Sequence, residues 1–267
     1  MQVDHFFQQL WFDYVHVTPQ AQVIQKALEM VGENLVHDHV SLRTFNLSPM
    51  NIVMLEQHLL NLGYKHFSPY ELEDRRLQAW SYLPPHEGLP RVFFSELQTQ
   101  YLSYKAQQVI HRLVDEVPLE AVKRPQVFWS GRLWSMPTWD EYQLLLSESE
   151  YAAWLSVMGL RANHFAISVN HLSRTPDIDQ VLNKVEALGY GLNLNGGRIR
   201  GSRIDLLEQG ATLPDQMMML FADGSEHPVP TCHYEFARRY PDYPGHLYDG
   251  FVATGIDPAF SKYSPLV

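Results

Sequence analysis

Cysteine is almost absent from the sequence, and so is any long apolar run. Cys232 is the single cysteine among 267 residues, which excludes an internal disulfide. No stretch approaches the roughly 20 apolar residues that cross a bilayer. The first residues (MQVDHFFQQLWFDY) have an acid and no basic flank, unlike a secretory signal. We therefore expect a soluble cytoplasmic protein with no membrane partner.

Positive charge is also scarce. Twenty Lys and Arg stand against thirty Asp and Glu, and the resulting net charge of −10 repels a phosphate backbone, so nucleic acid is excluded as the expected partner. Hydrophobic residues make up 45% of the chain, enough for a sizeable core. Histidine is the residue in surplus, with 13 copies against six lysines. Because histidine is the commonest metal ligand, these positions are the first candidates for chemistry.

The same pattern of elements occurs twice along the chain. Each copy begins with a strand rich in β-branched residues, continues with an amphipathic helix that starts at a Ser-Pro or Thr-Pro pair, and ends in Leu-Gly-Tyr. His39 precedes its glycine, Gly63, by 24 residues, and His164 precedes Gly189 by 25. This match predicts an internal duplication. The strands are expected at 37–45 and 162–169, and the helices after Ser48-Pro49 and Thr175-Pro176.

Each copy continues into further strands, so each half is predicted to be βαβββ. These strands are expected at 78–83 and 91–97 in the first half, and at 197–207, 216–221 and 231–237 in the second. The predicted fold class is α+β, with the duplicated units forming one curved sheet or pseudo-barrel in a single pseudo-symmetric domain. Its expected parts are a helical extension (1–35), the first half (36–98), a helical insert (99–160), the second half (161–240) and a packed C-terminal loop (241–267).

Side chains alternate between the two faces of a strand. In the first copy this places His37, His39, Ser41 and Arg43 on one face and the apolar residues on the other; in the second copy His164 takes the place of His39. The apolar faces suit the helices. We therefore expect the two matched histidines to meet on the opposite surface when the halves pack together.

The last strand of each half adds an acid, Glu96 in VFFSEL and Glu235 in CHYEFA. Two histidines with one carboxylate form the facial arrangement of non-haem Fe(II) oxygenases, whereas two histidines with both acids suit other divalent metals. Each residue also has an ordinary alternative as a polar strand residue or half of an ion pair. The matched placement favours a metal site.

The segments DHVSLRTF, ANHFAISV, VFFSEL and CHYEFARR resemble the 2-oxoadipate dioxygenase/decarboxylase (hydroxyglutarate synthase) family of the vicinal oxygen chelate superfamily. The resemblance covers most of residues 35–260. It implies that His39, His164 and Glu235 bind iron and that Arg43 holds a substrate carboxylate, with Glu96 outside the metal shell. The family's C-terminal substrate-binding segment corresponds loosely to FVATGIDPAF (251–260).

This resemblance implies an Fe(II)-dependent reaction in which dioxygen converts 2-oxoadipate into 2-hydroxyglutarate and carbon dioxide. Two alternatives remain open. One is a redox-neutral lyase, isomerase or hydrolase of the glyoxalase type that uses Zn, Ni or Mn, and a Glu96 carboxylate beside the metal would favour it. The other is a non-catalytic module that binds a metal or ligand. The sequence makes no prediction of oligomeric state.

Three other histidines and the cysteine receive simpler interpretations. His37 is expected at the surface, His171 in a loop, and His233 beside the site without a defined role. Cys232 is expected to be a small buried hydrophobic residue.

Overall fold

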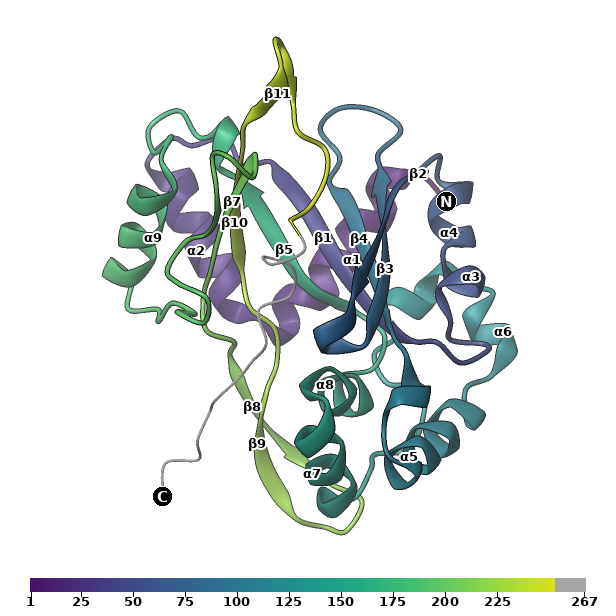
Figure 1. Ribbon diagram of the computed structural model, residues 1–267. Helices are drawn as coiled ribbons and strands as arrows, with labels where there is room; N and C mark the ends of the chain where they lie inside the picture. Colours follow the sequence, from purple (N-terminus) through teal and green to yellow (C-terminus); the bar gives the residue numbers. More distant parts are fainter. Residues whose placement is uncertain (253–267) are drawn as a thin grey trace.

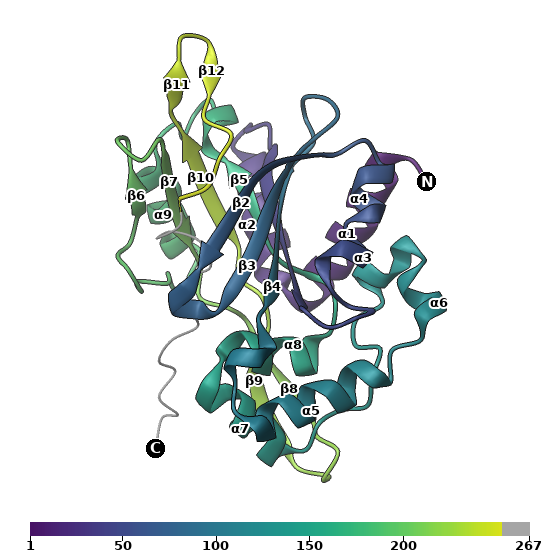
Figure 2. The same cartoon turned by 45° about the vertical axis from the view of Figure 1, so that its right-hand side comes forward.

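A curled eight-stranded sheet forms the centre of the molecule, and most of the helices cover its convex side (Figures 1 and 2). The computed structural model describes residues 1–252. The strand order is β2-β3-β4-β1-β5-β10-β7-β6. These strands are β1 (His37–Phe45), β2 (Lys65–Leu72), β3 (Leu77–Leu83), β4 (Arg91–Leu97), β5 (Ala162–Ser168), β6 (Arg200–Ser202), β7 (Leu207–Ala211) and β10 (Glu235–Arg239).

Each half of the sheet has the predicted βαβββ order. The first half runs β1, α3 (Ile52–Leu55), α4 (Gln57–Asn61), β2, β3 and β4, and the second runs β5, α9 (Ile178–Ala187), β6, β7 and β10. In each half the last strand pairs in parallel with the first, and β1 pairs antiparallel with β5. The two strands that carry the matched histidines are therefore neighbours at the middle of the sheet.

Both helices of the repeat begin later than the sequence predicts. The Asn51 side chain caps α3 by accepting a hydrogen bond from the Met54 amide, and Asp177 caps α9. Thr175 does not serve as a cap, because its hydroxyl donates to Glu33 instead. The apolar face of α9 is buried as expected, at Ile178, Val181, Leu182 and Val185.

The second half contains two departures from the predicted strands. Residues 197–207 do not form one strand, because a turn with Leu206 at φ 62° separates β6 from β7. Residues 216–221 do not join the central sheet. They form β8 (Gln216–Leu220), which pairs with β9 (Glu226–Pro230) in a hairpin that packs against the insert through stacked Trp139 and His227 rings. This hairpin explains why the second half is longer than the first.

The remaining helices lie where the predicted extension and insert place them along the chain. Helices α1 and α2 pack behind the sheet, and α5–α8 gather at one end of it (Figure 1). Their bounds are α1 (Val3–Val17), α2 (Pro19–Met30), α5 (Tyr104–Asp115), α6 (Leu119–Val122), α7 (Trp139–Glu148) and α8 (Glu150–Met158). Within residues 1–252, none of the helices is both long and apolar enough to cross a membrane.

The C-terminal region begins with a hairpin rather than the predicted loop. Strands β11 (Pro241–Tyr243) and β12 (His246–Leu247) pair antiparallel above the sheet (Figure 2). The chain then returns towards the concave face, where Phe251 is 5% exposed. Residues 253–260 of the predicted substrate-binding segment lie outside the described residues.

Candidate metal centre

Three predicted side chains meet on the concave face of the sheet. The Nε2 atoms of His39 and His164 are 3.3 Å apart, and Oε2 of Glu235 lies 3.4 Å and 2.9 Å from them. All three residues are buried, with at most 4% of their surface exposed. Ligand atoms about 2.0–2.2 Å from one ion are separated by about 3 Å. The three atoms therefore form a group that can hold a metal ion.

A β-bulge precedes each of these histidines. In β1, Asp38 is the extra residue between the pairs His37↔Ile167 and His39↔Ala166; in β5, Asn163 is the extra residue between Ala162 and His164. A bulge breaks the alternation of side chains and redirects those beside it. As a result, Asp38 lies beside His39, and Asn163 beside His164, although adjacent residues of a regular strand point to opposite faces.

The two bulge residues hold the histidine rings. Oδ1 of Asp38 lies 2.7 Å from Nδ1 of His39, and Oδ1 of Asn163 lies 3.0 Å from Nδ1 of His164. Each oxygen accepts a hydrogen bond from Nδ1–H, so that Nε2 of each histidine is directed at the point where the three candidate ligands meet. Hydrogen bonds of this kind fix the tautomer and orientation of metal-binding histidines.

Two buried arginines support the same group. Arg239 donates through Nε and Nη2 to both carboxylate oxygens of Asp38, at 2.7 and 2.9 Å. Although burial opposes ionisation of Asp38, the Arg239 charge holds the pKa of this carboxyl well below its usual range. Arg200 donates to Oε1 of Glu235 at 2.7 Å, which leaves Oε2 for the centre.

Glu235 is ionised at neutral pH. Burial alone would raise its pKa, but the charges and hydrogen bonds of His164, His39 and Arg200 hold the pKa well below the usual range. An ionised carboxylate is the form that binds a metal. The chemistry of the donor set therefore fits a divalent cation.

A small cavity adjoins the three side chains, and Phe251 is one of the residues that line it. Its lining residues are His39, Ser41, Phe93, His164, Gln209, Glu235 and Phe251. The Phe251 ring centroid lies 5.0 Å from that of His39 and 5.1 Å from that of Phe93. Arg239 holds this segment by donating to the carbonyls of Tyr248 and Gly250, both at 2.7 Å. The centre is therefore shielded from bulk water.

Arg43 lies on the same strand as His39, towards the helical insert. It is 2% exposed, and its guanidinium lies 4.9 Å from the ring centroid of Tyr151 and 5.1 Å from that of Trp154, both on α8. Such a position over aromatic faces stabilises a buried cation. Arg43 is thus a second buried arginine, besides Arg200, on the concave side of the sheet.

The prediction that His37 shares a strand face with His39 is wrong. The bulge at Asp38 turns it to the helical side, where its ring centroid lies 4.7 Å from that of Trp11 and Nε2 lies 3.3 Å from the Tyr234 hydroxyl. Its side chain is half-buried and lies on the face opposite that of His39. Burial lowers the pKa of His37 to about 4, so it is neutral.

Other predicted residues lie around the centre or away from it. His233 is buried with its ring centroid 4.7 Å from that of His164, and His171 follows β5 with Nδ1 2.9 Å from the Ser168 hydroxyl. Cys232 is fully buried. Glu96 points to the other face of the sheet, where its Oε2 accepts the Ile52 amide hydrogen bond at 2.9 Å and stabilises the start of α3.

Sequence reasoning missed four residues that support the centre. Asp38, Asn163 and Arg200 contact the three candidate ligands, and Arg239 contacts Asp38. For Asp38 and Asn163 a signal exists, because each precedes its histidine at matched positions in the two copies. For Arg200 and Arg239 none exists. The pairing of β6, β7 and β10 brings Arg200 to Glu235, and the pairing of β10, β5 and β1 brings Arg239 to Asp38.

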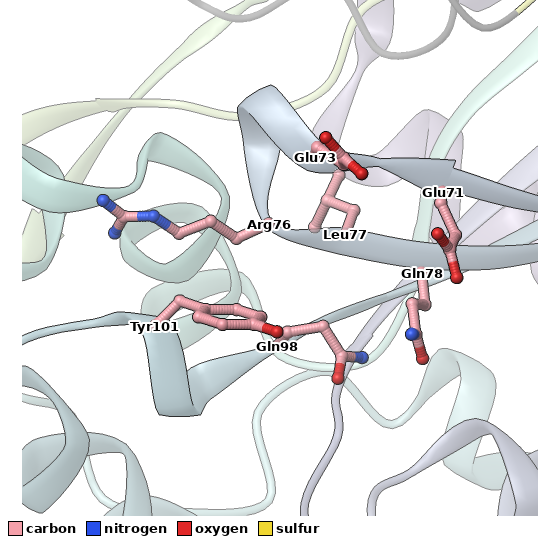
Figure 3. Close-up of a pocket in the computed structure, with 7 residues that line it drawn as sticks. All are labelled: Glu71, Glu73, Arg76, Leu77, Gln78, Gln98 and Tyr101. Carbon is pink, nitrogen blue, oxygen red and sulfur yellow. The ribbon is translucent and has the colours of Figure 1, made fainter.

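A larger surface cavity lies at the turn between β2 and β3 (Figure 3). Its lining residues are Glu71, Glu73, Arg76, Leu77, Gln78, Gln98 and Tyr101. It contains neither histidine nor cysteine, and the buried Gln98 amide is already bonded to Glu96 and Asn46. The centre at His39, His164 and Glu235 is therefore the stronger candidate for catalysis.

Comparison with known proteins identifies relatives over almost the whole chain. The family model for 2-oxoadipate dioxygenase/decarboxylase matches residues 13–119 and 119–257. The chain is 31% identical to the 2-oxoadipate dioxygenase/decarboxylase, chloroplastic/amyloplastic, of Oryza sativa subsp. japonica, and the match covers 94% of this chain and 76% of that protein.

Solved structures agree with this assignment. The hydroxyglutarate synthase of Oryza sativa in complex with 2-oxoadipate has a TM-score of 0.89 at 29% identity, over 96% of this chain and 90% of that one. A Shewanella frigidimarina protein described as a hydrolase has a TM-score of 0.90 at 40% identity, over 94% and 98%. A glyoxalase-superfamily protein of Ralstonia eutropha, at 22% identity and TM-score 0.73 over 92% and 84%, shares the fold. The predicted vicinal-oxygen-chelate-like fold is confirmed, and the chain belongs to the 2-oxoadipate dioxygenase/decarboxylase family.

Proposed function

We propose that the protein is an Fe(II)-dependent dioxygenase that converts 2-oxoadipate into 2-hydroxyglutarate and carbon dioxide. The observation that carries the proposal is the buried group of two histidines and one carboxylate beside a small cavity, which leaves coordination positions free on one side. Family membership and the 2-oxoadipate bound to the rice relative support the substrate. In the overall reaction, one atom of dioxygen completes the new carboxylate and the other becomes the hydroxyl.

In this proposal His39, His164 and Glu235 are the metal ligands. When bound, Fe(II) supplies Lewis acidity and the redox chemistry of dioxygen; Zn, Ni or Mn are the alternatives for the same ligand set. Asp38 and Asn163 keep the Nε2 lone pairs directed at the metal, and Arg200 leaves Glu235 one free oxygen.

The remaining residues bind and enclose the substrate. Arg43 anchors a carboxylate, because a buried guanidinium can donate two parallel hydrogen bonds to it. Phe251 excludes water from the cavity, which strengthens every electrostatic interaction inside it. Both roles orient the 2-oxo acid without taking part in bond cleavage.

The position of Glu96 argues against a redox-neutral enzyme of the glyoxalase type. That site would need the Glu96 carboxylate beside the metal, but it bonds to the Ile52 amide on the opposite face. Three protein ligands favour the oxygenase arrangement. We also propose a cytoplasmic location, since the single cysteine allows no internal disulfide.

Oxygen uptake tests the activity directly. The iron-loaded protein is expected to consume one dioxygen per 2-oxoadipate and to release one carbon dioxide. The metal site is tested separately by the melting temperature, because binding to the native state stabilises it. Divalent metal should raise the melting temperature of wild type and of His171→Ala, but not of His164→Ala. Absence of oxygen uptake with a panel of 2-oxo acids rejects the activity, and an equal thermal shift in His164→Ala rejects the ligand set.

A further inference from the structure

Arg200 is a buried arginine whose donors are only partly used. Its side chain is 6% exposed, and Nη2 donates to Oε1 of Glu235 at 2.7 Å. Nε and Nη1 are also buried, and within residues 1–252 they have no hydrogen-bond partner. Leaving such donors unpaired is unfavourable by about 1–3 kcal/mol, more for a charged group. The two donors therefore indicate a place for an acceptor that residues 1–252 do not supply.

The strand register directs Arg200 towards the metal centre. Arg200 is paired with Gln209 across β6 and β7, and paired residues point to the same face of a sheet. Gln209 lines the small cavity beside His39 and His164. The guanidinium therefore lies on the concave face. Only the carboxylate of Glu235 separates it from the position of the metal.

Arg200 also faces the open side of the curled sheet. It lines a second cavity together with Arg75, Asn195, Gly196, Ile199, Gly201 and Asp205. Arg75 comes from the turn between β2 and β3, so this cavity lies where the two edges of the sheet approach each other (Figure 2). Its charged lining residues are two arginines and one acid, and within the described residues Arg200 still has two unused donors besides its bond to Glu235. A charged ligand that reaches the metal from this side is expected to be an anion.

We propose that Arg200 binds the carboxylate next to the keto group of the 2-oxo acid through a guanidinium N–H that Glu235 leaves unused, on Nε or Nη1. This inference rests on the proposed function. A 2-oxo acid that binds a metal through its keto oxygen and one carboxylate oxygen leaves the second carboxylate oxygen without a partner, and a charged guanidinium N–H can donate a hydrogen bond to it. Arg43 lies four residues from His39, about 13 Å along the strand, and suits the remote carboxylate.

The test compares a 2-oxo acid with its neutral amide. Wild type, Arg200→Gln, Arg200→Lys and the control Arg198→Gln are loaded with Mn(II) without dioxygen, and the affinities for 2-oxohexanoate and 2-oxohexanamide are measured by calorimetry. Neither ligand has a second carboxylate, so Arg43 does not influence the comparison. Arg198 is a suitable control because it lies two residues away and pairs with Glu186 and Asp179.

Wild type and Arg198→Gln are expected to prefer the acid to the amide. In Arg200→Gln this preference should fall about tenfold or more, the scale of a lost charge-assisted hydrogen bond. Arg200→Lys should retain part of this preference, because the positive charge remains although the guanidinium geometry is lost. It also provides the test if the Gln variant does not fold.

Two outcomes contradict the inference in different ways. If Arg200→Gln weakens both ligands equally, or weakens only Mn(II) binding, Arg200 acts solely by positioning Glu235 and the inference is overturned. If wild type binds neither 2-oxohexanoate nor 2-oxoadipate, the proposed function itself fails.

Discussion

The two ligand histidines differ in the residue that holds each ring. Asp38 is ionised and paired with Arg239, whereas Asn163 is neutral. A carboxylate that accepts a hydrogen bond from Nδ1–H increases the electron-donating strength of Nε2 more than an amide oxygen does. His39 is therefore expected to be the stronger donor, so that the duplicated halves give the metal two unequal histidines.

Replacement of Asp38 by asparagine tests this difference. Asp38→Asn should lower the affinity for a divalent metal about 10–100-fold, because His39 loses its carboxylate partner. It should also destabilise the fold by about 3–5 kcal/mol, since Arg239 remains buried with its charge uncompensated. Metal titration and urea denaturation measure the two effects separately.

Asp249→Asn provides the matched control. Asp249 pairs with the partly exposed Arg91 on the same rim but does not contact His39. This variant should keep full metal affinity and lose little stability. Unchanged metal affinity in Asp38→Asn would show that the carboxylate stabilises the fold without influencing the metal.

At the scale of the element, sequence periodicity predicts strands well and the exceptions within them poorly. The alternation places His39, Ser41 and Arg43 on one face correctly. It fails at His37, because a bulge depends on the register between β1 and β5 rather than on either strand alone. The predicted helix starts are wrong for a related reason. Thr175 is a residue type that often caps helices, but its hydroxyl donates a hydrogen bond to Glu33, which is distant in the sequence.

Glu33 joins the end of α2 to the loop before α9, and this connection should make stability depend on pH. Its carboxylate accepts hydrogen bonds from the Ser173 and Arg174 amides, at 2.7 and 2.9 Å, and from the Thr175 hydroxyl at 2.8 Å. Burial raises the pKa of Glu33, but these bonds outweigh it and the net shift is downward. Because the folded pKa lies below the unfolded value, the stabilisation is present above the unfolded pKa and is lost as pH falls through the folded one.

Glu33→Gln should therefore destabilise the protein by about 1–3 kcal/mol at pH 7. The difference from wild type should begin to shrink as pH falls below about 4, the ordinary pKa of an unfolded glutamate, and should continue to shrink towards the lower folded pKa. Urea denaturation at a series of pH values measures it. A difference that stays constant down to pH 3 would show that the shape of the side chain matters and its charge does not.

At the scale of the whole molecule, the duplication predicts more than any single motif. Matched strands, helices and histidines are sufficient to predict a sheet in which His39 and His164 meet. They cannot predict what occurs in one half only, such as the β8–β9 hairpin or the position of Arg200, because these have no counterpart for comparison. The part of the site that departs from the duplication is also the part that we expect to contact the substrate.

The overall charge of −10 should slow the approach of a dicarboxylate, and the cavity lined by Arg75 and Arg200 offsets it locally. Arg75→Glu should therefore lower kcat/KM for 2-oxoadipate several-fold at low ionic strength, through a higher KM. The loss should largely disappear at about 0.5 M salt, where charges are screened within a few ångströms. Lys105→Glu changes the net charge equally on the exposed face of α5 and should have little effect. Equal losses in the two variants would mean that net charge, and not a local cationic opening, governs the approach of the substrate.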